Sequence, residues 1–379
     1  MDHGPARLLD LLGIDDARAP RWDCTGVVRD LLDHADPGTL LKQSKVSPIF
    51  IHAWWRSSST YVWSQLRCDP SLRCYYEPLH ERLAVLDRAT VEGSAEVGTS
   101  RQLRHPVPQR HYFFEYLDLI AQGRLRYSQD LAYARYLLRS DQADEALRDY
   151  LQGLIGAATA AGRTPVLCFC RGQMRSAWMK RVFGGFHVAQ IRNPFDQWAS
   201  FRIGPYFVGR MLAIALSLRR QHPSAFAHIE GFEQMANSLA PQGGIQGASG
   251  TTLPIGSRDL LGVFLVLWIA SALQAIGCCD HVLDVDRLSA DESYRQESSR
   301  WFRAVGCTAD FSDCSTPATK TDPASAALFE AMVAQAVRAI RSNASTLVIA
   351  DAAAAEQRLS SLSVASQRIL QQVIPGGRT

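Results

Sequence analysis

The chain lacks the signatures that would assign it quickly to several large classes of protein. It contains no Gly-Lys pair, which argues against a Walker A phosphate loop of the common kinase and ATPase type. Its nine cysteines form no Cys-x-x-Cys pair, so no zinc site is expected from ligand spacing. The formal net charge is only +3, which gives no argument for a nucleic-acid partner.

The N-terminal region lacks the apolar segment of a secretory signal, so we expect a cytoplasmic protein. One uncharged run, Leu260–Cys279, is long enough to cross a bilayer. Asp259 and Asp280 flank it, and Ser271 and Gln274 lie within it. These polar residues and the scarcity of flanking basic residues favour a buried core helix, and we predict no membrane span.

Five short apolar runs are present in a chain of 379 residues that is 47% hydrophobic. They lie near residues 49–54, 72–76, 166–170, 187–191 and 281–285. Segments with helical periodicity separate these predicted strands. Such alternation predicts an α/β fold, a three-layer sandwich in which a mainly parallel sheet is covered by helices on both faces.

The first candidate site follows the first predicted strand. The apolar run Ile49–Trp55 turns through small polar residues into a predicted helix, Tyr61–Leu66. The residues of the turn are Arg56, Ser57, Ser58, Ser59 and Thr60. The first N–H groups of a helix have no intrahelical partner, and the helix dipole makes that end positive. With an arginine and several hydroxyls added, the turn predicts a phosphate or sulfate site.

A second cluster follows the fourth predicted strand. Val188–Ile191 forms the strand, Arg192 stands at its end, and Ser200 comes eight positions later. The intervening Asn193-Pro194 marks a turn into a helix, because proline suits the first helical turn. Arg192 and Ser200 could therefore meet around a further anion.

Together these residues resemble the sulfotransferases that use 3′-phosphoadenosine 5′-phosphosulfate. In that family a cation and a hydroxyl-rich turn bind the 5′-phosphosulfate. Here Arg56 matches the cation, Ser57 the first serine, and Tyr61 the aromatic residue that follows the turn. Ser59 and Thr60 match the paired hydroxyls. Ser58 stands where the family has glycine, and we expect serine to follow the same path only with a negative φ.

The resemblance extends to three further places. Arg192, Asn193-Pro194 and Ser200 match the family's 3′-phosphate motif in type and spacing. Glu77-Pro78 matches a Glu-Pro that commonly follows the next short strand. The segment that follows residue 281 looks like the last core strand, acidic turn and helix of the family.

The resemblance implies sulfuryl transfer by in-line displacement, with the phosphosulfate nucleotide as co-substrate and no metal. Arg56 would stabilise the charge on the leaving group, and Arg192 with Ser200 would hold the 3′-phosphate. A hydroxyl acceptor needs a general base. Glu77 is the first choice, because it ends the second predicted strand beside two tyrosines. His80 and Glu81 lie within one helical turn and are rivals.

The loop and the Glu-Pro lean toward the carbohydrate-type and bacterial branch, which implies a sugar or a small, natural-product-like acceptor. One alternative is a non-catalytic nucleotide- or glycan-binding protein of the same fold. Another is a different P-loop transferase or kinase, disfavoured by the missing Gly-Lys.

We expect the chain to be organised around one large domain. Residues 1–44 form a helical appendage, and residues 45–314 form the α/β domain. Within this domain, residues 84–162 exceed a simple crossover and predict a helical insertion over the acceptor side. Residues 315–379 form a linker and C-terminal helices, which could pack on the core or form a homodimer.

Overall fold

The structure is a computed structural model. It describes residues 47–93, 110–202, 205–239, 255–319, 322–343 and 352–374. The expected N-terminal appendage, 1–44, lies outside the described residues, as does most of the glycine-rich segment 241–257.

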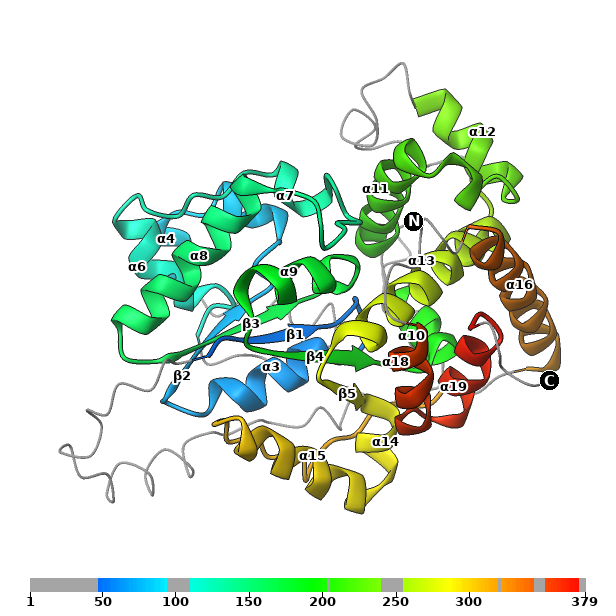
Figure 1. Ribbon diagram of the computed structural model, residues 1–379. Helices are drawn as coiled ribbons and strands as arrows, with labels where there is room; N and C mark the ends of the chain where they lie inside the picture. The colour runs from blue at the N-terminus through cyan, green and yellow to red at the C-terminus, as the bar shows by residue number, and fades with distance from the viewer. Residues whose placement is uncertain are drawn as a thin grey trace, which may run out of the picture.

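A sheet of five parallel strands forms the centre of the described part (Figure 1). The strands are β1 (Ile49–His52), β2 (Leu72–Tyr76), β3 (Thr164–Phe169), β4 (Phe186–Ile191) and β5 (His281–Asp284). Their order across the sheet is β2-β3-β1-β4-β5. The prediction of a mainly parallel sheet is thus confirmed, and each predicted strand overlaps an observed one.

Helices cover the sheet on both faces. On one face lie α8 (Glu145–Ala160), α9 (Ser176–Phe183) and α13 (Ser257–Cys278) (Figure 1). On the other face lie α3 (Ser59–Arg67), α14 (Val285–Ala290) and α15 (Glu292–Ala304). Successive side chains of β2 point to opposite faces of the sheet. The Tyr75 hydroxyl donates to Leu154 O of α8 at 2.9 Å, while the Tyr76 ring packs on Trp63 of α3. Burial on both faces explains why the strands are continuous apolar runs.

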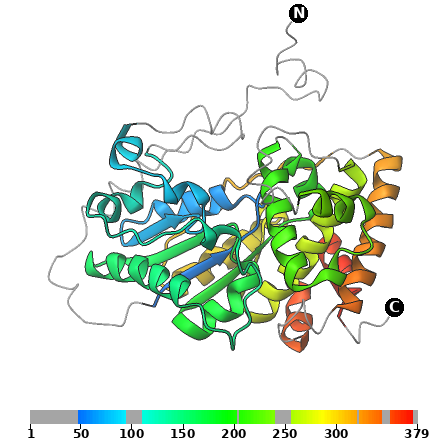
Figure 2. The ribbon, with the colours of Figure 1, turned by 90° about the horizontal axis from the view of Figure 1, so that it is seen from above.

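The segment between β2 and β3 is largely helical where it is described. It contains α4 (Arg88–Gly93), α6 (Leu117–Ala121), α7 (Asp130–Tyr133) and α8. It also contains two short 3-10 helices, η2 (Glu81–Ala84) and η3 (Phe114–Tyr116). These elements lie together at the β2 side of the sheet (Figures 1 and 2).

The uncharged run forms the long helix α13. By length and composition α13 could cross a membrane, but 94% of its most apolar window is buried inside the structure. The C-terminal helices α16 (Pro323–Ser342), α18 (Ala352–Arg358) and α19 (Val364–Gln371) pack against it (Figure 2). So do α10 (Pro194–Phe201), α11 (Pro205–Gln221) and α12 (Glu230–Leu239). α13 therefore has the surroundings of a core helix.

The strand order predicts a ligand crevice at the carboxyl ends of β1 and β4. From β1 the chain moves through α3 to β2 on one side, whereas from β4 it moves to β5 on the other. In open parallel sheets, ligands bind outside the carboxyl ends of the strands where the connections diverge in this way. The turn after β1 and the turn after β4 both lie at that point.

Candidate functional site

The turn after β1 has an unusual backbone. Arg56 has a φ of 63° and Ser58 a φ of 62°, both in the left-handed region. The expectation that serine would need a negative φ at position 58 is therefore wrong. Ser58 is also the N-cap of α3, and its side chain makes no capping hydrogen bond there. Non-glycine residues held in this region are strained, and such strain is common at functional sites.

The first amide groups of α3 point out of the helix without partners. The backbone N–H groups of Ser58, Ser59 and Thr60 donate to no residue that the structure describes. The nine-residue helix behind them places partial positive charge at the same point. The turn thus has the donors that an anion would require.

The predicted hydroxyls differ in whether they already form hydrogen bonds within the protein. Ser57 Oγ donates to Trp54 O at 2.6 Å, and Thr60 Oγ1 lies 3.0 Å from Tyr76 Oη. Tyr61 Oη donates to Asp313 Oδ1 at 2.8 Å. These three groups fix the turn and α3 in place. Among the described residues, Ser59 Oγ hydrogen-bonds only to the Cys170 sulfur, at 3.1 Å. Sulfur is a weak hydrogen-bonding partner, so this hydroxyl and that of Ser58, which makes no capping bond, are the ones available to a ligand.

The two predicted clusters meet. Arg56 Nε donates to Ser200 Oγ at 2.9 Å, although the residues are 144 positions apart. Arg192 Nη1 donates to the carbonyl of Arg56 at 2.8 Å, and Nη2 to the carbonyl of Pro317 at 3.1 Å. α10 begins as expected, with Pro194 in its first turn and Asn193 accepting from the Phe195 N–H.

Two buried glutamines hold the turn after β1, and the sequence analysis missed both. Gln190 Nε2 donates to Ser57 O at 2.6 Å. Gln197 Nε2 donates to Trp55 O, also at 2.6 Å. An amide in an otherwise apolar strand, as Gln190 is, was an available signal, because a buried amide needs hydrogen-bond partners. Each glutamine joins the second cluster to the first.

Arg192 is only 5% exposed, and burial lowers the pKa of its guanidinium. Its Nε has no hydrogen-bond partner among the described residues. Asp286 lies nearby and accepts from the Asn193 N–H. Burial, together with the charge of Asp284, raises the pKa of Asp286 to about 6. Among the described residues, the two Nη groups of Arg192 donate to backbone carbonyls only and its Nε is unpartnered, so its guanidinium has a donor left for an anion.

Glu77 lies at the same edge of the sheet, directly after β2. Its φ is 39°, and its N–H donates to Cys168 O at 2.8 Å, which turns the chain out of the sheet. The side chain is buried, and Oε2 makes no hydrogen bond to a described residue. Burial raises the pKa of Glu77; the Arg171 guanidinium opposes this, and the Glu81 charge adds to it. A carboxylate in this state is suited to accept a proton.

Glu81 has a different environment. Its carboxylate contacts Arg171 at 2.7 Å and Arg210 at 2.9 Å, and it accepts from the Tyr206 hydroxyl at 2.8 Å. Arg171 is the largest influence that lowers the pKa of Glu81, which lies far below the usual range despite burial. Glu81 is therefore a permanently charged partner of arginines, whereas Arg171 remains 4.0 Å from Glu77 Oε2.

Arg171 and α11 were not predicted as parts of this site. Arg171 is 1% exposed and lies two residues after the end of β3, much as Arg192 follows β4. An arginine after an apolar strand was therefore a signal that could have found it. Arg210 and Tyr206 come from α11, and no local pattern connects them to residues near 80.

His80 is held as a neutral ring. Burial, with Arg171 next in size, lowers the pKa of His80 to about 3. Its Nδ1 accepts from the Arg82 N–H at 3.2 Å, and its Nε2 lies 3.2 Å from the Tyr206 hydroxyl. Because Tyr206 donates to Glu81, His80 Nε2–H is the donor to Tyr206. Both ring nitrogens are thus in use, and the geometry favours Glu77 as the base.

Cys170 connects the turn after β1 to Glu77. Its sulfur contacts Ser59 Oγ, and its thiol lies close enough to Glu77 to affect the pKa of that carboxyl. Trp54 forms an isolated bridge with Arg171, whose guanidinium lies 5.0 Å from the Trp55 ring. The candidate anion site and the candidate base are therefore neighbours.

No family model, no curated protein and no solved structure matches this chain. The function is therefore inferred from the fold and from the geometry of this site.

Proposed function

We propose that the chain is an O-sulfotransferase of the P-loop sulfotransferase fold, which transfers a sulfuryl group from 3′-phosphoadenosine 5′-phosphosulfate to a hydroxyl. The observation that carries the proposal is the meeting of Arg56, Ser200 and Arg192 in front of α3. These residues come from two turns that are distant in sequence. Both turns lie where strand order predicts a ligand crevice.

The chemistry of the turn suits both ends of the donor nucleotide. The amides at the start of α3, together with Ser59, provide donors for the 5′-phosphosulfate. Arg192 and Ser200 provide a cation and a hydroxyl for the 3′-phosphate, and the unpartnered Nε of Arg192 supports this assignment. Arg56 contacts the second pair directly, because its Nε donates to Ser200 and its carbonyl accepts from Arg192.

The proposed reaction needs one proton acceptor and stabilisation of one leaving charge. Glu77 takes the proton of the acceptor hydroxyl while the acceptor oxygen bonds to sulfur. The bond from sulfur to the phosphate oxygen breaks in the same step, and its electron pair stays on the nucleotide. Arg56 and the α3 amides would stabilise this developing negative charge.

The alternatives are less well supported. A kinase would need a lysine at the phosphates, and the described turn carries Arg56 without one. A non-catalytic binding protein was suggested by serine in place of glycine. Ser58 nevertheless adopts the left-handed conformation that a glycine would favour, so this substitution alone gives no reason to expect a different loop path.

Calorimetric titration with 3′-phosphoadenosine 5′-phosphate tests the donor site. We expect micromolar binding by the wild type and a 10- to 100-fold loss in Arg192→Ala, the range for a hydrogen bond to a charged group. Arg181→Ala is the control, because Arg181 is an exposed arginine on α9. An absence of binding by the folded wild type would reject the proposed function.

A further inference from the structure

A group of buried polar atoms around Arg171 lacks hydrogen-bond partners of normal geometry among the described residues. It includes Glu77 Oε2, Arg171 Nε and the hydroxyl oxygens of Tyr127 and Tyr133. The Arg171 guanidinium lies 5.4 Å from the centroid of the Tyr133 ring, and the charges of Arg171 and Glu81 act on the pKa of both tyrosines. Buried polar groups are normally paired, so several unpaired ones together indicate a place where a polar ligand binds.

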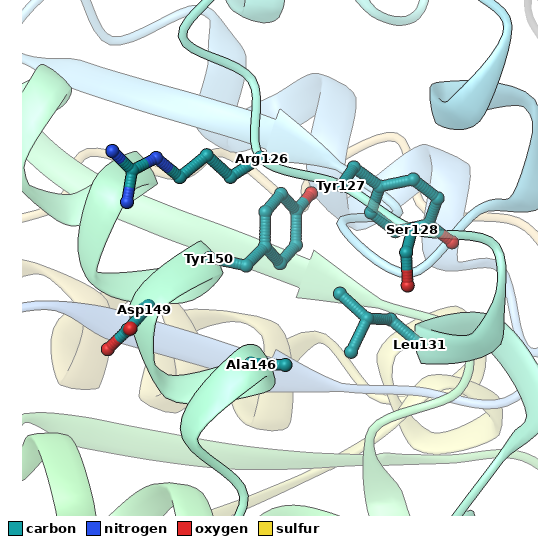
Figure 3. Close-up of a pocket in the computed structure, with 7 residues that line it drawn as sticks. All are labelled: Arg126, Tyr127, Ser128, Leu131, Ala146, Asp149 and Tyr150. Atoms are coloured by element: carbon teal, nitrogen blue, oxygen red, sulfur yellow. The ribbon is translucent and has the colours of Figure 1, made fainter.

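A surface pocket of about 290 Å³ borders this group. Figure 3 shows the Tyr150 ring between Arg126 and Asp149 on one side and Ser128 and Leu131 on the other. Tyr127 belongs to both regions: it lines the pocket, and its hydroxyl is buried near Arg171.

Tyr150 connects the pocket to the candidate base. Its ring packs edge-on against Tyr127, with centroids 5.2 Å apart. Its hydroxyl donates to Pro78 O at 2.6 Å, and Pro78 directly follows Glu77. The Tyr150 side chain therefore extends from the pocket to the backbone beside Glu77.

Charges of both signs lie in both regions. The inner group pairs Glu77 and Glu81 with Arg171 and Arg210, and the pocket contains one arginine and one aspartate. An anionic ligand would be repelled by the two glutamates, and a cationic one by the two arginines. A neutral ligand with several hydroxyls would meet donors and acceptors without either penalty.

We propose that this pocket and the hydroxyls of Tyr127 and Tyr133 form the acceptor subsite, which binds a neutral, hydroxyl-rich molecule of about one sugar ring at its inner end. The subsite rests on the proposed function for its role as an acceptor site. Its existence as a binding site for a neutral polyol does not depend on that role.

Saturation-transfer NMR tests this subsite without any turnover. The probes are methyl β-D-glucopyranoside, D-glucuronate and D-glucosamine, which are matched in size and are neutral, anionic and cationic, respectively. We expect saturation of the neutral glycoside above that of the two charged sugars. Tyr127→Phe and Tyr133→Phe should each weaken it about tenfold, as expected for the loss of a hydrogen bond.

Tyr136→Phe is the matched control. Its hydroxyl is also buried and without a hydrogen-bond partner of normal geometry, but it lies by Trp54 and Ser271 and does not line the pocket. Glycoside binding that is absent, or equal in all three variants, overturns the subsite. A wild type that binds the glycoside but not 3′-phosphoadenosine 5′-phosphate would reject the sulfotransferase proposal and support the subsite. A wild type that binds the nucleotide but not the glycoside would reject the subsite and support the donor site.

Discussion

Arg56 donates a hydrogen bond from Nε to Ser200 Oγ at 2.9 Å, and this contact, together with the bond from Gln197 to Trp55, joins the turn after β1 to the helix after β4. The backbone carbonyl of the same arginine accepts from Arg192. One residue thus touches both members of the second cluster. This arrangement gives Ser200 a role that an ordinary helix residue would not have.

Ser200→Ala should weaken binding of 3′-phosphoadenosine 5′-phosphate roughly fivefold. The change removes one hydroxyl donor and also frees Arg56 from its fixed position, which corresponds to about 1 kcal/mol. Calorimetry measures the effect. Ser64→Ala on α3 is the control, because this half-buried serine only donates to Tyr61 O. Equal affinities in Ser200→Ala and wild type would separate Ser200 from the nucleotide.

Glu77→Gln should leave nucleotide affinity within twofold and reduce turnover at least about 100-fold, because the amide cannot accept the proton. The measurement is release of 3′-phosphoadenosine 5′-phosphate in the presence of a hydroxyl acceptor that the wild type uses. His80→Gln is the comparison and should retain more activity, since His80 is neutral and occupied at both nitrogens. Near-normal turnover by Glu77→Gln would move the role to another residue.

Glu81→Gln should lower the pKa of Glu77. Burial raises that pKa, Arg171 opposes the increase, and the negative charge of Glu81 reinforces it. Removing the charge of Glu81 eliminates the repulsion and leaves Arg171 free to favour ionised Glu77. Carbon-13 NMR of side-chain-labelled glutamate measures the titration, and Glu77→Gln identifies the signal.

Glu92→Gln controls for a general effect on charge, because Glu92 pairs with Arg88 at an exposed site on α4. The pKa of Glu77 should be unchanged in this variant. A pKa of Glu77 that rises or stays constant in Glu81→Gln would show that Arg171 is not shared between the two carboxylates.

Ser58→Gly should increase the free energy of unfolding by about 0.5–1 kcal/mol. Serine at a φ of 62° is strained, and its side chain makes no capping bond that would be lost. The greater entropy of glycine in the unfolded chain reduces the gain. Chemical denaturation measures it. Ser64→Gly, inside α3, should instead destabilise by about 1 kcal/mol. Destabilisation by Ser58→Gly would mean that the turn depends on the serine.

Stability should fall as the pH drops from about 6.5 toward 4. Burial lowers the pKa of His187 and His281 to about 4 and of His80 to about 3, and lowers that of His52 as well. The unfolded chain therefore binds these protons first, and each site removes up to about 1.4 kcal/mol per pH unit. The carboxyls of Asp286, Asp284, Glu77 and Glu115 have raised pKa values and oppose this toward the acidic end, so the loss of stability should be steepest just below pH 6.5, where the histidines of the unfolded chain begin to bind protons.

His281→Gln provides the internal check on this pH dependence. His281 stacks on Trp301 with ring centroids 4.4 Å apart, at one edge of the sheet. The slope of the unfolding free energy against pH is proportional to the number of protons taken up on unfolding. In the variant this number should be smaller by about one. A slope identical to that of the wild type would show that His281 does not contribute to acid sensitivity.

The sequence analysis was most successful where the signal was continuous and local. The strands were found because each is buried on both faces and therefore largely apolar. The long uncharged run was interpreted as a core helix, and α13 is buried as that interpretation requires. The sequence left open whether the C-terminal helices pack on the core or on a partner chain. In the structure they pack on α13 of the same chain.

Several parts of the candidate site depend on contacts between distant segments. Arg171 meets Glu81 only because β3 lies between β2 and β1, and Arg210 reaches Glu81 from α11. The choice among Glu77, His80 and Glu81 was open in the sequence, since all three lie within five residues. The directions of their side chains separate them.

By itself the sequence determined the type and order of the elements. It placed Arg56 and Arg192 after strands and Ser200 in the helix that follows β4, because burial and helix initiation act on neighbouring residues. Only the tertiary structure decided which carboxylate is paired with arginine. The pKa of a buried group depends on the charges and hydrogen-bonding groups within a few ångströms of it. Segments that are distant in sequence supply these groups, so only the fold determines which they are.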